Sequence, residues 1–85
     1  MKEYYLYILR SEKTNKIYIG HSQNVGKRLR QHNAGESDST RFACDWAVVH
    51  TEAYSSRSLA MKREKFLKSG RGRKILKTLA IIIGA

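Results

Sequence analysis

Five residues of this chain have side chains that are common in catalytic sites: Tyr7, Tyr18, Arg28, His32 and Glu64. Phenol, imidazole and carboxylate groups exchange protons, and a guanidinium binds anions through a planar pair of donors. The tyrosines belong to two short apolar runs, the arginine and histidine follow soon after, and the glutamate stands much later. These five residues can form one catalytic site only if the strands and helices that carry them bring them together.

The two tyrosines lie in a predicted β-hairpin. β-Branched and aromatic side chains dominate residues 5–9 and 16–20, and residues 10–15 between them are turn formers. Side chains alternate between the two faces along a strand. The alternation allows Tyr7 and Tyr18 to share one face of the sheet.

Arg28 and His32 lie in a predicted helix over residues 25–33. Gly20 permits a backbone geometry that a side chain would resist, and the polar residues 21–24 can cap the helix. Arg28 stands four residues before His32, which is the spacing of neighbours on a helix surface. The guanidinium and the imidazole are therefore predicted to be neighbours, at the edge of an apolar stripe of Val25, Leu29 and His32.

The rest of the chain predicts one more strand and two more helices. Residues 46–54 have the composition of a strand, and residues 33–41 before it are predicted to be a mobile surface loop. Ser55 and Ser56 are typical of a helix start. Gly70 and Gly72 are expected to end that helix, with the last helix starting at about Arg73.

Glu64 is predicted to lie at the border of a buried helix face. That face is defined by two pairs with seven-residue spacing, Leu59 with Phe66 and Ala60 with Leu67. An acid at such a border is costly unless it is paired. One interpretation is a weak salt bridge to Lys68, Arg63 or Lys62. The other is a hard divalent ion, which would explain a lone acid among cations.

The tripeptides Tyr5-Leu6-Tyr7 and Tyr18-Ile19-Gly20 resemble the two motifs of the GIY-YIG nuclease domain. The resemblance covers nearly the whole chain and points to the small stand-alone bacterial members, which are related to the catalytic N-terminal domain of the excision-repair nuclease. It implies an α+β fold in which a small three-stranded antiparallel sheet is flanked by helices in the order β-β-α-β-α-α, as a single domain over residues 1–85.

The resemblance also implies a reaction, the metal-dependent hydrolysis of phosphodiester bonds in nucleic acid. Tyr18 would act as the general base or orient the water, and Tyr7 would hydrogen-bond the phosphate or the water. Arg28 would hold the scissile phosphate, and His32, with His21, would assist proton transfer or phosphate contact. Glu64 would bind one divalent ion, Mg²⁺ or Mn²⁺.

The chain departs from the family pattern at two positions. Tyr5 stands where the first motif opens on glycine, and no asparagine follows Asn33, although many members have one after the acidic helix. The missing asparagine supports an alternative function, a catalytically degenerate module that binds nucleic acid. A weaker alternative is a self-associating structural protein that uses the apolar residues 79–83.

The charge distribution predicts a nucleic-acid partner. The net charge is +10, and from Arg57 onward nine Lys and Arg stand against the single acid Glu64. Such a stripe attracts polyanions whatever their sequence. With no sequence-reading element present, we expect structure-selective binding, of DNA more than RNA, with specificity from a protein partner. The expected contacts are His21, Lys27, Arg41, Lys62, Arg63, Lys68, Arg71, Arg73 and Lys74.

Length and composition suit one small globular domain. Cys44 is the only cysteine, which excludes an intramolecular disulfide, and we expect it to be a small core residue. The run over residues 79–83 is far shorter than the ~20 residues of a membrane helix. We therefore expect a cytoplasmic monomer or weak dimer without a membrane partner.

Overall fold

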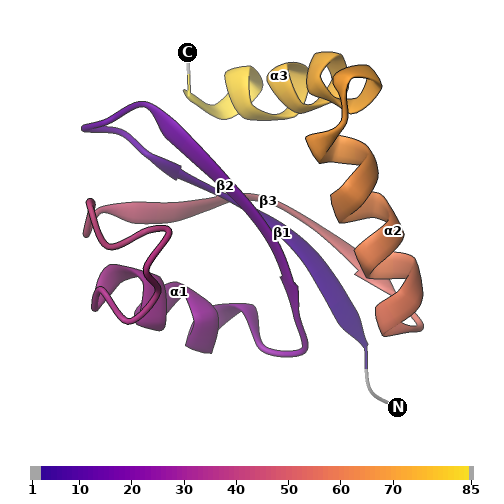
Figure 1. The fold of residues 1–85 in the computed structure, drawn as a ribbon, viewed down its shortest axis with the longest axis horizontal. Coiled ribbons are helices and arrows are strands. Elements are labelled where there is room, and N and C mark those ends of the chain that lie inside the picture. Colours follow the sequence, from indigo (N-terminus) through magenta and orange to yellow (C-terminus); the bar gives the residue numbers. More distant parts are fainter. Residues whose placement is uncertain (1–2, 85) are drawn as a thin grey trace.

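The computed structural model describes residues 3–84, which form a three-stranded sheet with three helices around it (Figure 1). The elements follow the predicted order and confirm the α+β class. They are β1 (Tyr4–Ser11), β2 (Lys16–Ser22), α1 (Val25–Asn33), β3 (Trp46–Tyr54), α2 (Arg57–Lys68) and α3 (Gly70–Gly84).

The first strand lies in the middle of the sheet. The strand order is β2-β1-β3, and both pairings are antiparallel. Tyr7 stands opposite Gly20, and Leu9 stands opposite Tyr18. Because Leu9 is two residues from Tyr7, both tyrosines project from the same face of the sheet, as the alternation predicts.

The sheet separates two apolar layers. Helix α1 covers one face, while α2 and α3 cover the other (Figure 1). Under α1 the buried residues are Tyr7, Leu9 and Trp46. Under α2 and α3 they are Leu6, Ile8, Ile19 and Leu67. Each buried side chain of this size contributes roughly 1.5–3 kcal/mol, so both helix layers are firmly attached to the strands that carry the tyrosines.

Polar caps set the starts of α1 and α2. The Asn24 side chain accepts a hydrogen bond from the backbone nitrogen of Lys27 at 3.0 Å, and the Ser56 side chain accepts one from Leu59 at 3.3 Å. These caps satisfy backbone donors that lack a partner within the helix. The predicted starts of both helices are confirmed.

The predicted break between the last two helices is wrong in detail. Helix α2 ends at Lys68 and α3 begins at Gly70, so Gly72 lies inside α3. A Cβ atom at Gly72 would collide with the carbonyl group of Phe66. Glycine is needed here because the first turn of α3 presses against the last turn of α2, and the residue does not end a helix.

The predicted buried face of α2 is half right. Ala60 and Leu67 are fully buried, but Leu59 is 44% exposed and Phe66 is 37% exposed. The helix packs on the sheet along one narrow stripe, and Leu59 and Phe66 fall beside it. The guanidinium of Arg63 covers the Phe66 ring instead, at 5.6 Å from its centroid.

Two further predictions concern Cys44 and the C-terminal apolar run. Cys44 is exposed, so its prediction as a core residue is wrong. Residues 79–83 continue α3, and Leu79 packs against the core under this helix. The side chains of residues 80–84, on which the self-association hypothesis depends, lie outside the described ones. In the described part of the chain, no helix has the length and apolarity to cross a membrane.

Candidate active site

The hydroxyl group of Tyr7 is held beneath α1 by a buried histidine. Its oxygen lies 3.1 Å from Nε2 of His32, and Nδ1 of His32 lies 2.7 Å from Oγ1 of Thr40. Tyr7 is 1% exposed, and His32 and Thr40 are fully buried. Burial, and then the charge of Arg28, lower the pKa of His32, so the imidazole is neutral at pH 7.

Gly20 leaves room for this hydroxyl. A Cβ atom at Gly20 would lie 2.6 Å from the Tyr7 oxygen and 3.0 Å from the Tyr18 ring. The sequence suggested a conformational reason for this glycine. The structure shows a steric one instead, because Gly20 has no positive φ and the Tyr7 ring crosses directly over it.

The guanidinium of Arg28 lies beside the hydroxyl group of Tyr7. The Tyr7 hydroxyl raises the pKa of Arg28 against the opposing effect of burial, and Tyr18 adds a smaller effect in the same direction. Burial raises the pKa of Tyr7, and Arg28 opposes this change. Arg28 also donates a hydrogen bond from Nη1 to Oε1 of Gln31 at 3.0 Å. The guanidinium is thus held in place while remaining fully charged.

Tyr18 completes the group on this face. Its ring lies 4.6 Å from the His32 ring and 6.2 Å from the Tyr7 ring, measured between centroids. Unlike Tyr7, it is partly exposed. The structure therefore brings four of the five predicted catalytic residues together, with Tyr7 and His32 inside and Arg28 and Tyr18 nearer the solvent.

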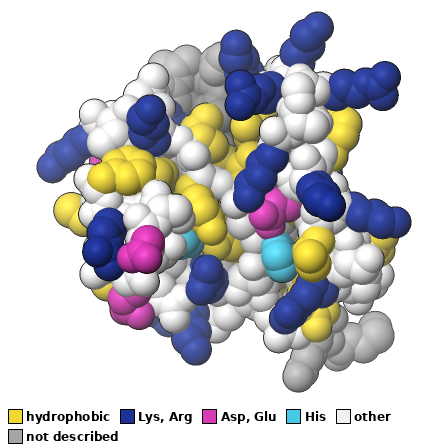
Figure 2. All heavy atoms as spheres, in the orientation of Figure 1, with side chains coloured by type: hydrophobic (Ala, Val, Ile, Leu, Met, Phe, Trp, Pro, Cys, Tyr) yellow, Lys and Arg dark blue, Asp and Glu magenta, His cyan; other side chains and the backbone are white. Residues whose placement is uncertain are grey.

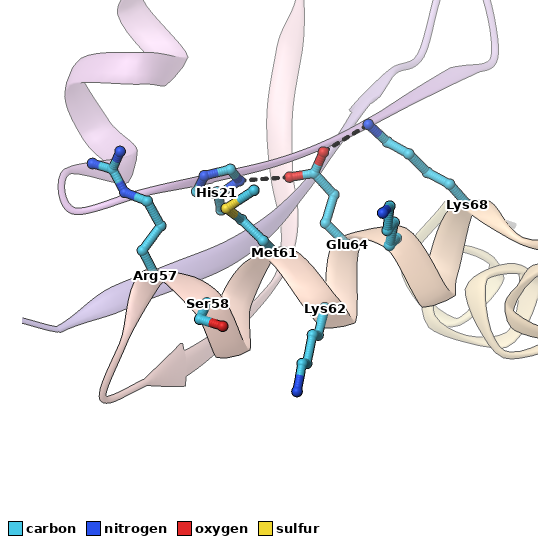
Figure 3. A pocket seen from close by; sticks show the side chains of 8 residues that line it. His21, Arg57, Ser58, Met61, Lys62, Glu64 and Lys68 are labelled. Carbon is cyan, nitrogen blue, oxygen red and sulfur yellow. Dashed lines mark hydrogen bonds and ion pairs between the residues drawn. The ribbon is translucent and has the colours of Figure 1, made fainter.

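Glu64 projects from α2 toward the end of β2, where it meets His21 (Figure 3). Its Oε1 lies 2.7 Å from Nδ1 of His21, and its Oε2 accepts a hydrogen bond from Nζ of Lys68 at 2.7 Å. Burial alone would raise the pKa of Glu64, but the hydrogen bonds from His21 and Lys68 outweigh it and lower the pKa. Glu64 is therefore a carboxylate at neutral pH.

A divalent ion at Glu64 would be held by a single carboxylate, in a hollow that Arg57, Lys62, Lys65 and Lys68 also line. Among the described residues, no group of three or more His, Cys, Asp and Glu side chains lies close enough to share a metal ion. The Glu64 side chain is 21% exposed and borders a hollow of about 630 Å³. Mg²⁺ commonly takes one or two carboxylates and completes its shell with water and substrate phosphate. Each Glu64 oxygen keeps a free acceptor site beside its hydrogen bond.

Three neighbouring hollows connect the two groups of residues. Arg28 and Gln31 line one hollow with His32, and they also line a second hollow that contains His21 and Arg57. His21 and Arg57 line in turn the hollow that borders Glu64. Because neighbouring hollows share lining residues, they form a row that runs from Arg28 past the end of β2 to Glu64. We call this row of three adjoining hollows the trough.

Most of the predicted nucleic-acid contacts lie either along this trough or on the exposed surface at the start of α3. Lys27 lines the middle hollow, and Lys62 and Lys68 line the hollow beside Glu64. Figure 2 shows Lys and Arg side chains over this face, most numerous on its α2 and α3 side. The exposed residues at the start of α3 are Arg71, Arg73 and Lys74.

Besides His21 and Lys68, which bond Glu64, two more of the predicted contacts are paired with acids. Arg63 donates hydrogen bonds to both oxygens of Glu52, at 2.9 and 3.2 Å, and its side chain is 27% exposed. Arg41 pairs with Asp38 at 2.9 Å on the open surface. The bidentate, partly buried pair keeps Arg63 bound to Glu52 on β3, so Arg63 is not free to contact nucleic acid. The exposed pair of Arg41 is weak, and a phosphate can replace Asp38.

Sequence reasoning missed the roles of Thr40 and Asn33. The segment after α1 was expected to be a mobile loop, but Thr40 bonds His32, and its carbonyl oxygen accepts a hydrogen bond from the Trp46 indole at 3.0 Å. Asn33 bonds the backbone nitrogen and oxygen of Trp46, at 2.7 and 3.0 Å. A polar residue in a Ser-rich segment gives no sequence signal for such contacts.

Comparisons with known proteins agree with this geometry. Residues 3–77 match the family model described as the GIY-YIG catalytic domain. A UPF0213 protein of Natronomonas pharaonis is 40% identical over 68 residues, covering 79% of each chain. One of Staphylococcus haemolyticus is 37% identical over 70 residues, covering 81% of this chain and 84% of the relative.

A solved structure shows the same fold. The solution NMR structure of a UPF0213 protein from Bacillus halodurans is 31% identical, has a TM-score of 0.54, and covers 91% of this chain and 84% of its own. The motif residues, the element order and these matches lead to one assignment. The chain belongs to the GIY-YIG nuclease family, among its small UPF0213-like domains.

Proposed function

We propose that this protein is a metal-dependent endonuclease that hydrolyses phosphodiester bonds, with DNA as the favoured substrate and structure rather than sequence as the basis of selection. The observation that carries the proposal is the trough that joins Arg28 to Glu64. One end presents a fixed guanidinium beside two tyrosines, and the other presents an ionised carboxylate among lysines.

The Arg28 end of the trough would bind the scissile phosphate. A guanidinium donates two parallel hydrogen bonds to phosphate oxygens and neutralises the charge that develops during hydrolysis. Its hydrogen bond to Gln31 orients it before substrate arrives, with the Tyr7 hydroxyl close by. Tyr7 has almost no exposed surface, so its contribution in this proposal is to hold Arg28 rather than to touch the phosphate.

Tyr18 would orient the attacking water or take its proton. It is the more exposed of the two tyrosines, and its ring packs against His32 close to Arg28. A positioned general base contributes typically 10²–10⁴-fold to the rate. His32, with both ring nitrogens already bonded, would act through the residues that it holds.

Glu64 would hold one Mg²⁺ or Mn²⁺, which supplies charge stabilisation at the leaving oxygen when bound. His21 and Lys68 keep the Glu64 carboxylate ionised and pointed into the trough. Lys62, Lys65 and Arg57 line the same hollow and would draw the nucleic-acid backbone toward it. A protein partner that supplies specificity belongs to the same proposal.

A second function, a non-catalytic nucleic-acid binding module, is favoured by one observation. Both Glu64 oxygens are already engaged, by His21 and by Lys68. If those bonds persist in solution, they compete with the metal, and the cationic trough alone would provide salt-sensitive binding.

Cleavage of labelled DNA and RNA, each single-stranded, duplex and branched, tests both functions. The wild type is compared with Tyr18→Phe and Glu64→Ala, in Mg²⁺, Mn²⁺ or EDTA. Matched controls are Tyr5→Phe, which removes a tyrosine hydroxyl whose hydrogen bond to Glu3 is exposed, and Glu12→Ala, which removes an exposed acid in the hairpin turn. The endonuclease predicts metal-dependent cleavage that both site variants lose and both controls keep. Salt-sensitive binding without cleavage of any substrate would establish the binding module instead.

A further inference from the structure

A chain of hydrogen bonds runs inward from Tyr7 and ends on the backbone of the segment after α1. It passes from the Tyr7 hydroxyl to Nε2 of His32 at 3.1 Å, and from Nδ1 of His32 to Oγ1 of Thr40 at 2.7 Å. Thr40 then donates to the carbonyl oxygen of Ser37 at 3.5 Å. The three side chains have between 0% and 1% exposure, so water does not compete for the two contacts of His32, whereas the contact with Ser37 is only partly buried.

The two ends of this chain decide its direction. Arg28 lies at the Tyr7 end, and a guanidinium can only donate hydrogen bonds. The Ser37 carbonyl lies at the other end and can only accept them. A neutral imidazole has one donor nitrogen and one acceptor nitrogen. With the Ser37 carbonyl as the last acceptor, one arrangement gives every donor an acceptor: Tyr7 donates to His32, His32 to Thr40, and Thr40 to Ser37. The lone pairs of the Tyr7 oxygen are then free to face the guanidinium.

We infer that Thr40 is a positioning residue that fixes His32 in the tautomer protonated on Nδ1, and that this tautomer makes the Tyr7 hydroxyl donate inward, so that its oxygen presents lone pairs on the side of Arg28. The inference deepens the proposed function, and its kinetic part rests on that function. Neither the family motifs nor the charge pattern point to Thr40.

The opposite tautomer would disturb Arg28. With the proton on Nε2, His32 would donate to the Tyr7 oxygen and occupy one of its two lone pairs. The Tyr7 proton would then turn outward, toward the side where Arg28 lies, and its positive end would oppose the guanidinium. Arg28 would keep Gln31 as a partner but would face a hydroxyl proton instead of a lone pair on Tyr7.

Nitrogen NMR of the histidine rings tests the tautomer directly and needs no substrate. Protein labelled with ¹⁵N-histidine gives ring signals for His21, His32 and His50, which are assigned with His21→Gln and His50→Gln. The expected result at pH 7 is a His32 ring with a protonated Nδ1 and a bare Nε2. A proton on Nε2, or a rapid average of both forms, would overturn the inference whether or not the protein cleaves nucleic acid.

Three variants test the role of Thr40. Thr40→Val keeps the shape and removes the acceptor for Nδ1, so His32 is expected to shift toward the Nε2-protonated form. Cleavage by this variant should fall about tenfold or more. Thr40→Ser keeps the hydroxyl and should retain both the tautomer and the rate. Thr78→Val, on an exposed residue of α3, is the matched control and should change neither.

The outcomes are separable. An unchanged tautomer and rate in Thr40→Val would overturn the assignment of Thr40. If wild-type protein cleaves nothing, the proposed function fails, while the tautomers of wild type and variants still decide the inference. If Thr40→Val does not fold, the tautomers of wild type and Thr40→Ser decide it, and a serine variant that loses the Nδ1 proton would overturn it.

Discussion

The hydroxyl oxygen of Tyr7 lies where a side chain on Gly20 would be, 2.6 Å from the position of an added Cβ atom. Tyr7 reaches His32 and Arg28 only by crossing the backbone of β2 at this residue. The YIG glycine is therefore part of the site because it leaves space for the first tyrosine.

Gly20→Ala is expected to displace the Tyr7 ring and to reduce cleavage strongly. Inserting a methyl group into such a packed contact typically costs about 1–3 kcal/mol of stability. Thermal unfolding and the cleavage rate measure the two effects. Gly26→Ala is the control, because its Cβ would meet ordinary contacts of 3.7 Å and 3.8 Å on α1. The control should be neutral or stabilising, and equal behaviour of the two variants would contradict the steric role of Gly20.

Gly72→Ala is expected to be more destabilising than Gly20→Ala. The atoms in its way belong to the backbone of Phe66 and Leu67, which cannot turn aside as a side chain can, so α2 and α3 must separate. Urea unfolding should show a loss of about 3 kcal/mol. Gly70→Ala, with nothing within 4 Å of its Cβ, should stay within about 1 kcal/mol of wild type. A harmless Gly72→Ala would show that the close approach of the two helices is absent in solution.

Arg28→Ala should abolish cleavage while leaving most of the binding to DNA. The guanidinium sits at the trough, but most of the positive charge lies from Arg57 onward. Fluorescence anisotropy across a salt series measures binding independently of cleavage. Lys74→Ala is the complementary variant, which should keep cleavage and reduce the slope of log affinity against log salt by up to about 1. If Arg28→Ala loses binding and cleavage together, the division between the trough and the α3 surface is wrong.

Glu52 should make the protein sensitive to acid. Burial opposes ionisation, but hydrogen bonds from Arg63, His50 and Tyr54 outweigh it and lower the pKa of Glu52 from 4.5 to about 2. Because the folded-state pKa is the lower one, the stabilisation is complete above about pH 5 and is lost as the pH falls to 2. It is of the order of 3 kcal/mol.

Urea unfolding between pH 7 and pH 2.5 measures this loss. Glu52→Gln should flatten the acid limb of the stability curve and lower stability at pH 7. Asp38→Asn is the control, since its side chain is 92% exposed and its pair with Arg41 should matter little. If the loss of stability at low pH is the same in Glu52→Gln as in the wild type, a group other than Glu52 causes the acid sensitivity.

The residues that match the family motifs could be found because they follow local rules. Alternation along strands places Tyr7 and Tyr18 on one face, and helical spacing places Val25 and Leu29 on the face of α1 that packs on the sheet. The order of strands and helices follows from the same patterns. Glu64 was also expected at the border of a buried face, where the structure has it 21% exposed.

What the sequence could not reveal depends on contacts between segments that are far apart along the chain. His21 and Glu64 are 43 residues apart, and no periodicity relates β2 to α2. The same limit explains why Arg63 was assigned to nucleic acid before its pairing with Glu52 was visible. The sequence identifies Arg63 as a cation, but only the packing of β3 against α2 shows that Glu52 already pairs with it.

The sequence by itself determined the strand and helix order, the shared face of the tyrosines and the cationic segment from Arg57 onward, because each follows from propensity, periodicity or composition. The tertiary structure alone decided that Tyr7 is buried, that Thr40 lies behind His32 and that His21 and Lys68 hold Glu64. Such contacts arise when α1 and α2 pack on opposite faces of the sheet, which fixes distances that no local pattern encodes.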